Sequence, residues 1–250
     1  METSSKLIYD GSFEGFLTTV FVCYEERLNV VNILPQHLFE QDFFSESQEI
    51  ITDDKKADRV WKGLAQFPIF RHHVYWSFLS EIEKHEMTLL KAIQYVLKTG
   101  NSKDYGQADV LKTAQFAKMV GREKHRMEAF VRFQLTQDGI YFSKIEPDFN
   151  VLPLISKHFK NRYADQQWII YDLKRNYGLY YDLNTVAIMQ MDFSEAPNKE
   201  DVFAGEELAY DKLWRNYFKS TNIKSRINLK LHTRHIPKRY WKYLNEKLSI

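Results

Sequence analysis

Apolar residues recur at helical spacing through most of the first half of the chain. Ser12 is placed to cap a helix over residues 13–27, because its hydroxyl can accept a hydrogen bond from an amide of the first turn. The helical pattern returns over residues 69–120, where Gly100 marks a helix end, and a further helix is expected over residues 108–129. This half is therefore predicted to be mostly helical.

Short extended segments interrupt these helices. Residues 6–9 alternate between polar and apolar side chains and predict an opening strand, and residues 49–52 predict a second one. Asp53 or Asp54 is then expected to cap the next helix. Residues 32–47 mix polar and aromatic side chains and are predicted to be irregular.

After residue 130 the apolar pattern changes to a period of two. Residues 131–145 alternate on both sides of Asp138-Gly139, which is typical of a β-hairpin. A helix is expected from Asn150, and further strands at residues 168–173 and 185–191. The predicted fold class is α+β, in which a helical N-terminal half precedes an antiparallel sheet with helices packed on one face.

A polar stretch at residues 194–201 is the predicted linker. It separates a single α+β core, residues 1–193, from a basic, aromatic-rich segment, residues 202–250, which we expect to pack on that core. Pro237 suits the first turn of a last helix that runs to about Lys247. The chain is therefore expected to have a basic helical C-terminal ending.

Charge is distributed very unevenly along the chain. The formal net charge is only +2. The segment Lys212–Lys247, however, holds 11 Lys or Arg residues and a single acid, so it carries +10 and the remainder carries −8. Such asymmetry is expected when one part of a chain faces a polyanion.

The basic ending interleaves cations with aromatic rings. Lys and Arg neutralise phosphates, and aromatic rings stack on unpaired bases with a gain of roughly 1–3 kcal/mol per base. The alternative is a solvated basic face, with Trp241 and Leu244 packing the last helix onto the core. The residues predicted to bind nucleic acid are Lys224, Arg226, Lys230, Arg234, Lys238, Arg239, Tyr240, Trp241 and Lys242.

Three carboxylates are candidates for catalysis. Asp10 and Glu14 lie in a predicted strand-to-helix turn, where they could bind a metal or act as acid and base. In the structural alternative, Gly11 permits the turn, Ser12 caps the helix and Glu14 complements the helix dipole. Asp172 ends a predicted strand, where pairing with Lys174 and Arg175 or capping the turn is the alternative to catalysis.

Other features narrow the function classes. Cys23 is the only cysteine, which excludes an internal disulfide, an iron–sulfur cluster and a zinc ribbon. The histidines are poorly spaced for a metal, and the chain lacks a phosphate loop, a dinucleotide fingerprint, a Gly-x-Ser-x-Gly elbow and a zinc-deaminase signature. Neither a signal peptide nor an apolar stretch of membrane length is present. We expect a soluble, cytoplasmic protein with no metal and no cofactor.

Several stretches of the chain resemble one bacterial protein family. They are Ile8–Gly15, His125-Arg126, Ala129–Phe133, His158-Phe159, Trp168–Asp172, Leu213–Phe218 and Arg234–Lys242. In this order they resemble an uncharacterised family labelled DNA metabolism or DNA repair protein. Its members are typically encoded beside a radical-SAM protein of DNA modification or repair, and some are fused to a uracil-DNA-glycosylase-like domain. The resemblance implies a role in DNA metabolism and such proteins as partners, but neither glycosylase activity nor a catalytic residue.

Together these patterns predict a DNA-binding accessory protein of DNA repair or modification, which acts with a partner enzyme and holds nucleic acid by its basic C-terminal surface. One alternative is an enzyme that acts on nucleic acid or nucleotides through Asp10, Glu14 and Asp172. That alternative requires the fold to gather the three carboxylates into one cleft. Another is an interaction module whose basic face binds an acidic partner protein.

Overall fold

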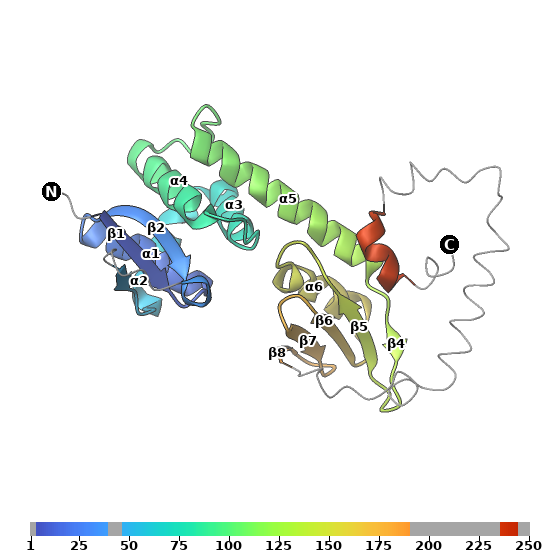
Figure 1. Cartoon of the computed structure of the whole chain (residues 1–250). Coiled ribbons are helices and arrows are strands. Elements are labelled where there is room, and N and C mark those ends of the chain that lie inside the picture. The colour runs from blue at the N-terminus through green and yellow to red at the C-terminus, as the bar shows by residue number, and fades with distance from the viewer. Residues whose placement is uncertain (1–3, 40–46, 191–235, 245–250) are drawn as a thin grey trace. The chain divides into compact units, whose positions relative to one another are not determined.

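The computed structural model describes residues 4–39, 47–190 and 236–244, which form an α+β fold (Figure 1). The chain divides into two compact units, Met1–Arg122 and Glu123–Ile250. The boundary between them falls inside helix α5 (Ala108–Phe130). Each unit has its own sheet.

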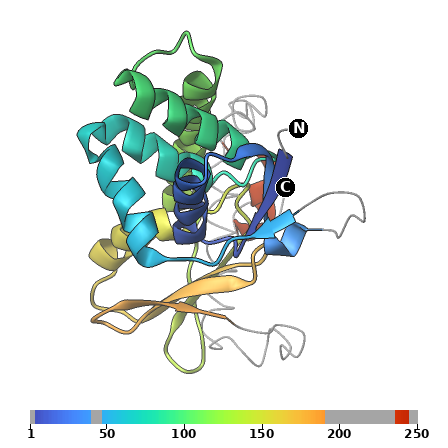
Figure 2. The same ribbon diagram turned by 90° about the vertical axis from the view of Figure 1, so that its left-hand side faces the viewer.

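The first unit contains a parallel three-stranded sheet in the order β2-β1-β3. The central strand β1 (Ser4–Tyr9) pairs with β2 (Asn29–Pro35) and with β3 (Ser47–Glu49). Helix α1 (Phe13–Glu25) connects β1 to β2, because parallel neighbours need a crossover connection. Figure 2 shows α1 alongside the strand that precedes it.

The two strands beside β1 correct the expectations for this region. Residues 32–47 were expected to be irregular and residues 49–52 to form a strand, but β2 occupies 29–35 and β3 occupies 47–49, while residues 40–46 lie outside the described part of the chain. Two asparagines and a terminal proline interrupt the apolar pattern of β2. Its buried Ile33 lies opposite the buried Leu7 of β1, so this strand is stabilised by a partner distant in sequence.

The predicted helices of the first unit are confirmed. They are α2 (Asp54–Gly63), α3 (Pro68–Phe78) and α4 (His85–Thr99). Asp53 caps α2 by accepting hydrogen bonds from two amides of its first turn, and Gly100 ends α4 with a φ of +71°. The apolar core of this unit includes Leu7, Phe16, Val20, Val74, Leu89 and Ile93.

The second unit contains a five-stranded sheet in the order β4-β5-β6-β7-β8. The strands are β4 (Gln134–Leu135), β5 (Tyr141–Ile145), β6 (Trp168–Asp172), β7 (Tyr177–Tyr181) and β8 (Val186–Met189). The expectation of an antiparallel sheet is wrong for one pair, because β5 and β6 run parallel. The other three neighbouring pairs are antiparallel, so the sheet is mixed.

Helix α6 (Leu152–Arg162) explains this parallel pair, since it is the crossover between β5 and β6. It packs against β7, and its Phe159 ring lies 6.2 Å from the fully buried Trp168 of β6. The predicted hairpin at Asp138-Gly139 joins β4 to β5, where Gly139 adopts a φ of +79°.

The C-terminal ending was expected to form a helix to about Lys247. Its described part forms a 3₁₀ helix, η4 (Lys238–Tyr243), and residues 245–247 lie outside the described residues. The predicted linker at residues 194–201 and the predicted contacts at Lys224, Arg226, Lys230 and Arg234 lie outside the described residues. Among the helices that the structure does describe, none is both long and apolar enough to cross a membrane.

Candidate anion-binding site

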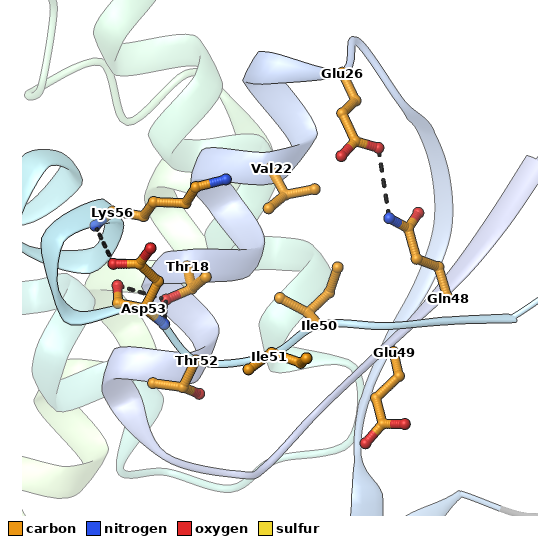
Figure 3. A pocket seen from close by; sticks show the side chains of 10 residues that line it. All are labelled: Thr18, Val22, Glu26, Gln48, Glu49, Ile50, Ile51, Thr52, Asp53 and Lys56. Carbon is orange, nitrogen blue, oxygen red and sulfur yellow. Dashed lines mark hydrogen bonds between the residues drawn. The ribbon is translucent and has the colours of Figure 1, made fainter.

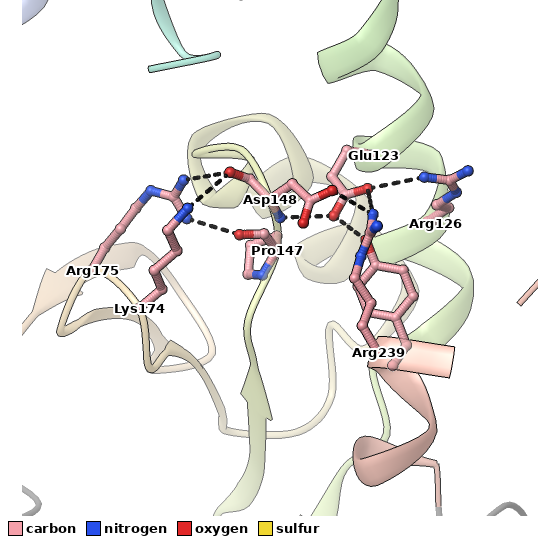
Figure 4. Close-up of polar contacts among 8 residues, drawn as sticks. Glu123, Arg126, Pro147, Asp148, Lys174, Arg175 and Arg239 are labelled. Atoms are coloured by element: carbon pink, nitrogen blue, oxygen red, sulfur yellow. Dashed lines mark hydrogen bonds and ion pairs between the residues drawn. The ribbon is translucent and has the colours of Figure 1, made fainter. Parts of the chain in front are cut away.

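Glu123 on α5 is a buried carboxylate, with only 1% of the side chain exposed. Its oxygens accept hydrogen bonds from Arg126 at 3.3 Å, Arg239 at 3.4 Å and the amide of Asp148 at 3.0 Å (Figure 4). The hydroxyl of Tyr240 also donates to this carboxylate. A buried charge is tolerated only when it is paired and hydrogen-bonded, so these four donors explain the buried position of Glu123.

Tyr240 fixes the C-terminal ending to this carboxylate. Its ring is buried, and the ring centroid lies 5.6 Å from that of Phe130. The guanidinium carbon of Arg239 lies over the same ring, 4.6 Å from the centroid. Burial and the hydrogen bond to Glu123 raise the pKa of Tyr240 above its usual value. The hydroxyl therefore remains a donor throughout the physiological pH range.

Asp172 and Arg175 hold the loop that faces this ending. Asp172 is fully buried and pairs with Arg175 at 2.7 Å. Arg175 also donates to the carbonyls of Pro147 and Asp148, both at 3.2 Å. Burial raises the pKa of Asp172, although the ion pair with Arg175 opposes the shift. These contacts favour the structural role for Asp172, which is to position the loop at residues 146–148.

An open pocket of about 480 Å³ lies at this loop. Four cations and two carboxylates contribute to its lining, so positive charge is in excess. We call it the cationic pocket, and its lining residues are Glu146, Pro147, Asp148, Lys174, Lys238, Arg239 and Lys242.

The four cations of the pocket differ in how strongly they are engaged. Arg239 pairs with Asp148 at 2.5 Å, and Lys242 pairs with Glu146. Lys174 donates to the carbonyl of Asp148 at 3.2 Å. Lys238 is exposed, and its side chain makes no ion pair or hydrogen bond within the described part of the chain. An incoming anion would thus meet Lys238 and Lys174 without first breaking a side-chain ion pair.

The structure brings three of the predicted nucleic-acid contacts to this pocket, namely Lys238, Arg239 and Lys242. Tyr240, predicted as a stacking ring, is instead buried against Glu123. Trp241 is half-buried, and its indole nitrogen donates to the carbonyl of Ile236 at 2.9 Å.

The alternative for this ending was that Trp241 and Leu244 pack it onto the core. Leu244 is fully buried, as that alternative expects. Its buried companion is Tyr240 rather than Trp241.

Glu123 and Asp148 were not singled out from the sequence, and Lys174 was considered only as a partner of Asp172. Glu123 stands among cations in the stretch 121–126, which has the composition of an exposed helix end. The one signal was that this stretch holds a single acid. A lone carboxylate among several cations is a natural partner for arginines brought from elsewhere in the fold.

In the first unit, Asp10 stabilises the turn between β1 and α1. It accepts hydrogen bonds from the amide and hydroxyl of Ser12, at 2.9 and 2.6 Å, and from Thr52 at 2.8 Å. Burial alone would raise the pKa of Asp10, but these hydrogen bonds hold it below its usual value. A Cβ on Gly15 would lie 2.2 Å from the Asp10 carboxylate, so this turn needs glycine there. Glu14 is exposed in the first turn of α1.

A second pocket, of about 390 Å³, lies beside this turn (Figure 3). Its polar side chains are largely engaged in local contacts. Gln48 donates to Glu26 at 3.4 Å, and Lys56 pairs with Glu25 at 2.7 Å. Asp53 caps α2, and its amide donates to Thr18 at 3.2 Å. Ile50 and Ile51 complete one wall with apolar surface.

The three catalytic candidates are explained by their local contacts. Asp10 and Glu14 belong to the first unit and Asp172 to the second. Asp10 caps a turn, Glu14 lies at a helix start and Asp172 pairs with Arg175. Within the described ranges, no three His, Cys, Asp or Glu side chains form a group that could hold a metal ion.

Comparison with known proteins gives one family match. A model described as a domain of unknown function, DUF4130, matches residues 83–246, which is more than half of the chain. No curated protein matches the chain. The matched range includes Glu123, the loop at residues 146–148 and the described C-terminal ending.

Proposed function

The chain belongs to the DUF4130 family, and we propose that it is a nucleic-acid-binding accessory protein that holds DNA by its phosphates at the cationic pocket. One observation carries this proposal. Lys174 and the cations of residues 238–242, which are far apart in the sequence, line the same open pocket. We further propose that the protein serves DNA repair or modification beside a separate enzyme, for which a radical-SAM protein or a uracil-DNA-glycosylase-like protein is the candidate.

Charge supports the choice of a polyanion over a small neutral ligand. Phosphate contacts by Lys and Arg release counterions and dominate non-specific affinity for nucleic acid. Residues 212–247 carry a charge of +10. Three cations of the pocket, Lys238, Arg239 and Lys242, belong to this segment, and Lys174 is the fourth. Lys224, Arg226, Lys230 and Arg234 belong to the same basic segment but lie outside the described residues.

The burial of Tyr240 shapes the proposed mode of binding. Because this ring is not exposed, base stacking on it does not contribute. Phosphate contacts fix the position of a protein on DNA but carry no base sequence information. We therefore propose binding that is largely independent of sequence, with target choice left to the partner enzyme.

The test is a fluorescence-anisotropy titration at several salt concentrations, with labelled single-stranded, double-stranded and uracil-containing DNA. The variant Lys174→Gln/Lys238→Gln removes two cations of the pocket. Its matched control is Lys91→Gln/Lys112→Gln, which removes two exposed cations of the first unit. We expect the pocket variant alone to lower the salt slope, by roughly 2 if each lysine contacts one phosphate.

Two results would overturn the proposal. One is the absence of binding at low salt, which would favour an acidic protein partner for the basic face. The other is an equal loss of affinity in the pocket variant and the control. Preferential binding of uracil-containing DNA would add damage recognition to the proposed function.

A further inference from the structure

The loop at residues 146–148 presents two carboxylates to the cations of the pocket. Asp148 pairs with Arg239 at 2.5 Å, and Glu146 pairs with Lys242. A carboxylate offers two oxygens to a guanidinium in much the same geometry as a phosphate does. The two acids thus pair with the same two cations, Arg239 and Lys242, that the phosphates of a nucleic acid would contact.

These side chains are not what holds the loop in place. The amide of Asp148 donates to Glu123 at 3.0 Å, and its carbonyl accepts from Arg175 and Lys174, both at 3.2 Å. The backbone therefore anchors the loop. The carboxylate of Asp148 makes its ion pair with Arg239 alone among the described residues.

Exposure distinguishes these two pairs from the buried Glu123 cluster. The side chains of Arg239 and Asp148 are 42% and 45% exposed, and those of Lys242 and Glu146 are 57% and 37% exposed. Ion pairs at such positions are weak because water competes for both charges. Both pairs can therefore open without unfolding the unit.

We infer that Glu146 and Asp148 are internal competitors of the phosphate backbone, so that Arg239 and Lys242 bind a nucleic acid only after exchanging these carboxylates for phosphates. This inference rests on the proposed function. Lys238 and Lys174 make the first contact, and the exchange follows. A ligand with several closely spaced phosphates compensates for both lost pairs, whereas a single phosphate compensates for one at most. The loop thereby favours a polymer over a nucleoside monophosphate.

The experiment compares the wild-type chain with Glu146→Gln/Asp148→Asn by anisotropy, using the same labelled double-stranded DNA over a range of salt concentrations. The control Asp138→Asn/Asp165→Asn removes the same charge from two exposed positions of the same unit that make no ion pair within the described residues. We expect the loop variant to bind roughly fivefold more tightly than this control.

Lys242→Gln distinguishes competition from a general change of electrostatic field. In the wild type Lys242 must give up its pair with Glu146 before it binds phosphate, so this substitution should weaken DNA binding by less than it does in a chain without that carboxylate. In the Glu146→Gln background the same substitution should weaken DNA binding several-fold. Equal losses in the two backgrounds would overturn the inference.

The outcomes separate the inference from the proposed function. Tighter binding by the loop variant than by the wild type and the control supports both. Binding by the wild type that matches the loop variant and the control overturns the competition and leaves the proposed function intact. No binding by any of these proteins overturns both. Circular-dichroism melting of each variant establishes that the comparison is made between folded proteins.

Discussion

The hydroxyl of Tyr240 donates a hydrogen bond to the carboxylate of Glu123, a residue 117 positions earlier in the chain. This contact joins the C-terminal ending to α5 within the second unit. Arg239 contributes to the same cluster by donating to the Tyr240 hydroxyl at 2.6 Å. Two neighbouring residues of a basic segment thus supply two of the four donors to one buried acid, and this fixes where the cations beside them can lie.

Tyr240→Phe should destabilise the second unit by about 1–3 kcal/mol, because the buried Glu123 loses a donor while the aromatic packing is kept. The measurement is urea denaturation at neutral pH. Tyr141→Phe is the matched control, since the hydroxyl of this half-buried tyrosine makes no hydrogen bond to a described residue. We expect it to cost less than about 0.5 kcal/mol. Equal losses would show that the Glu123 contact contributes nothing to stability.

Gly15→Ala should destabilise the first unit even though alanine favours helix by about 1 kcal/mol over glycine. The new Cβ would lie 2.2 Å from Asp10 and 2.8 Å from Thr52, so the turn must shift. Thermal melting followed by circular dichroism measures the effect, and Asp10→Ala/Gly15→Ala should recover part of the loss. The control is Gly63→Ala, whose Cβ would meet no atom within 4 Å. If Gly15→Ala and Gly63→Ala both leave the melting temperature unchanged or raise it, Asp10 does not restrict the side chain at position 15.

Elements set by local chemistry could be predicted from the sequence, and those set by distant partners could not. Ser12 and Asp53 cap their helices as expected, and Gly100 ends α4, because each acts within a few residues. Strand β2 depends on its pairing with β1 across the length of α1. The parallel pairing of β5 with β6 likewise follows from a crossover helix and not from the strand sequences themselves.

The positive charge of the candidate site could be predicted from the sequence, but the contacts within the site could not. The concentration of cations near the C-terminus pointed to Lys238, Arg239 and Lys242, which do line the pocket. Local sequence could not show that Tyr240 is buried, since the carboxylate that it contacts is supplied by α5. The available signal for burial was the spacing of Tyr240 and Leu244. An aromatic and an aliphatic side chain four residues apart can face the same side of a helix.

Asp172→Ala should destabilise the second unit by about 3–5 kcal/mol, because it removes the buried carboxylate that pairs with Arg175 at a position only 9% exposed. Chemical denaturation measures the loss. Asp172→Leu/Arg175→Met replaces the pair by apolar side chains and should be closer to wild type than the single variant is. A double variant as unstable as Asp172→Ala would contradict this account. If both proteins fold, weaker DNA binding would confirm that the pair positions the loop at residues 146–148.

The pKa of Asp10 leads to a prediction for stability at acid pH. Hydrogen bonds from Ser12 and Thr52 lower this pKa in the folded chain, so the folded state favours the carboxylate. The resulting stabilisation is fully present above the ordinary aspartate pKa, and it is lost as pH falls through the lower folded value. Asp10→Asn should therefore lower the free energy of unfolding more at pH 7 than at pH 3, measured by urea denaturation. Asp165→Asn, at an exposed position with no ion pair to a described residue, is the control for the removed charge. A wild-type advantage over Asp10→Asn that grows toward acid pH would contradict the prediction.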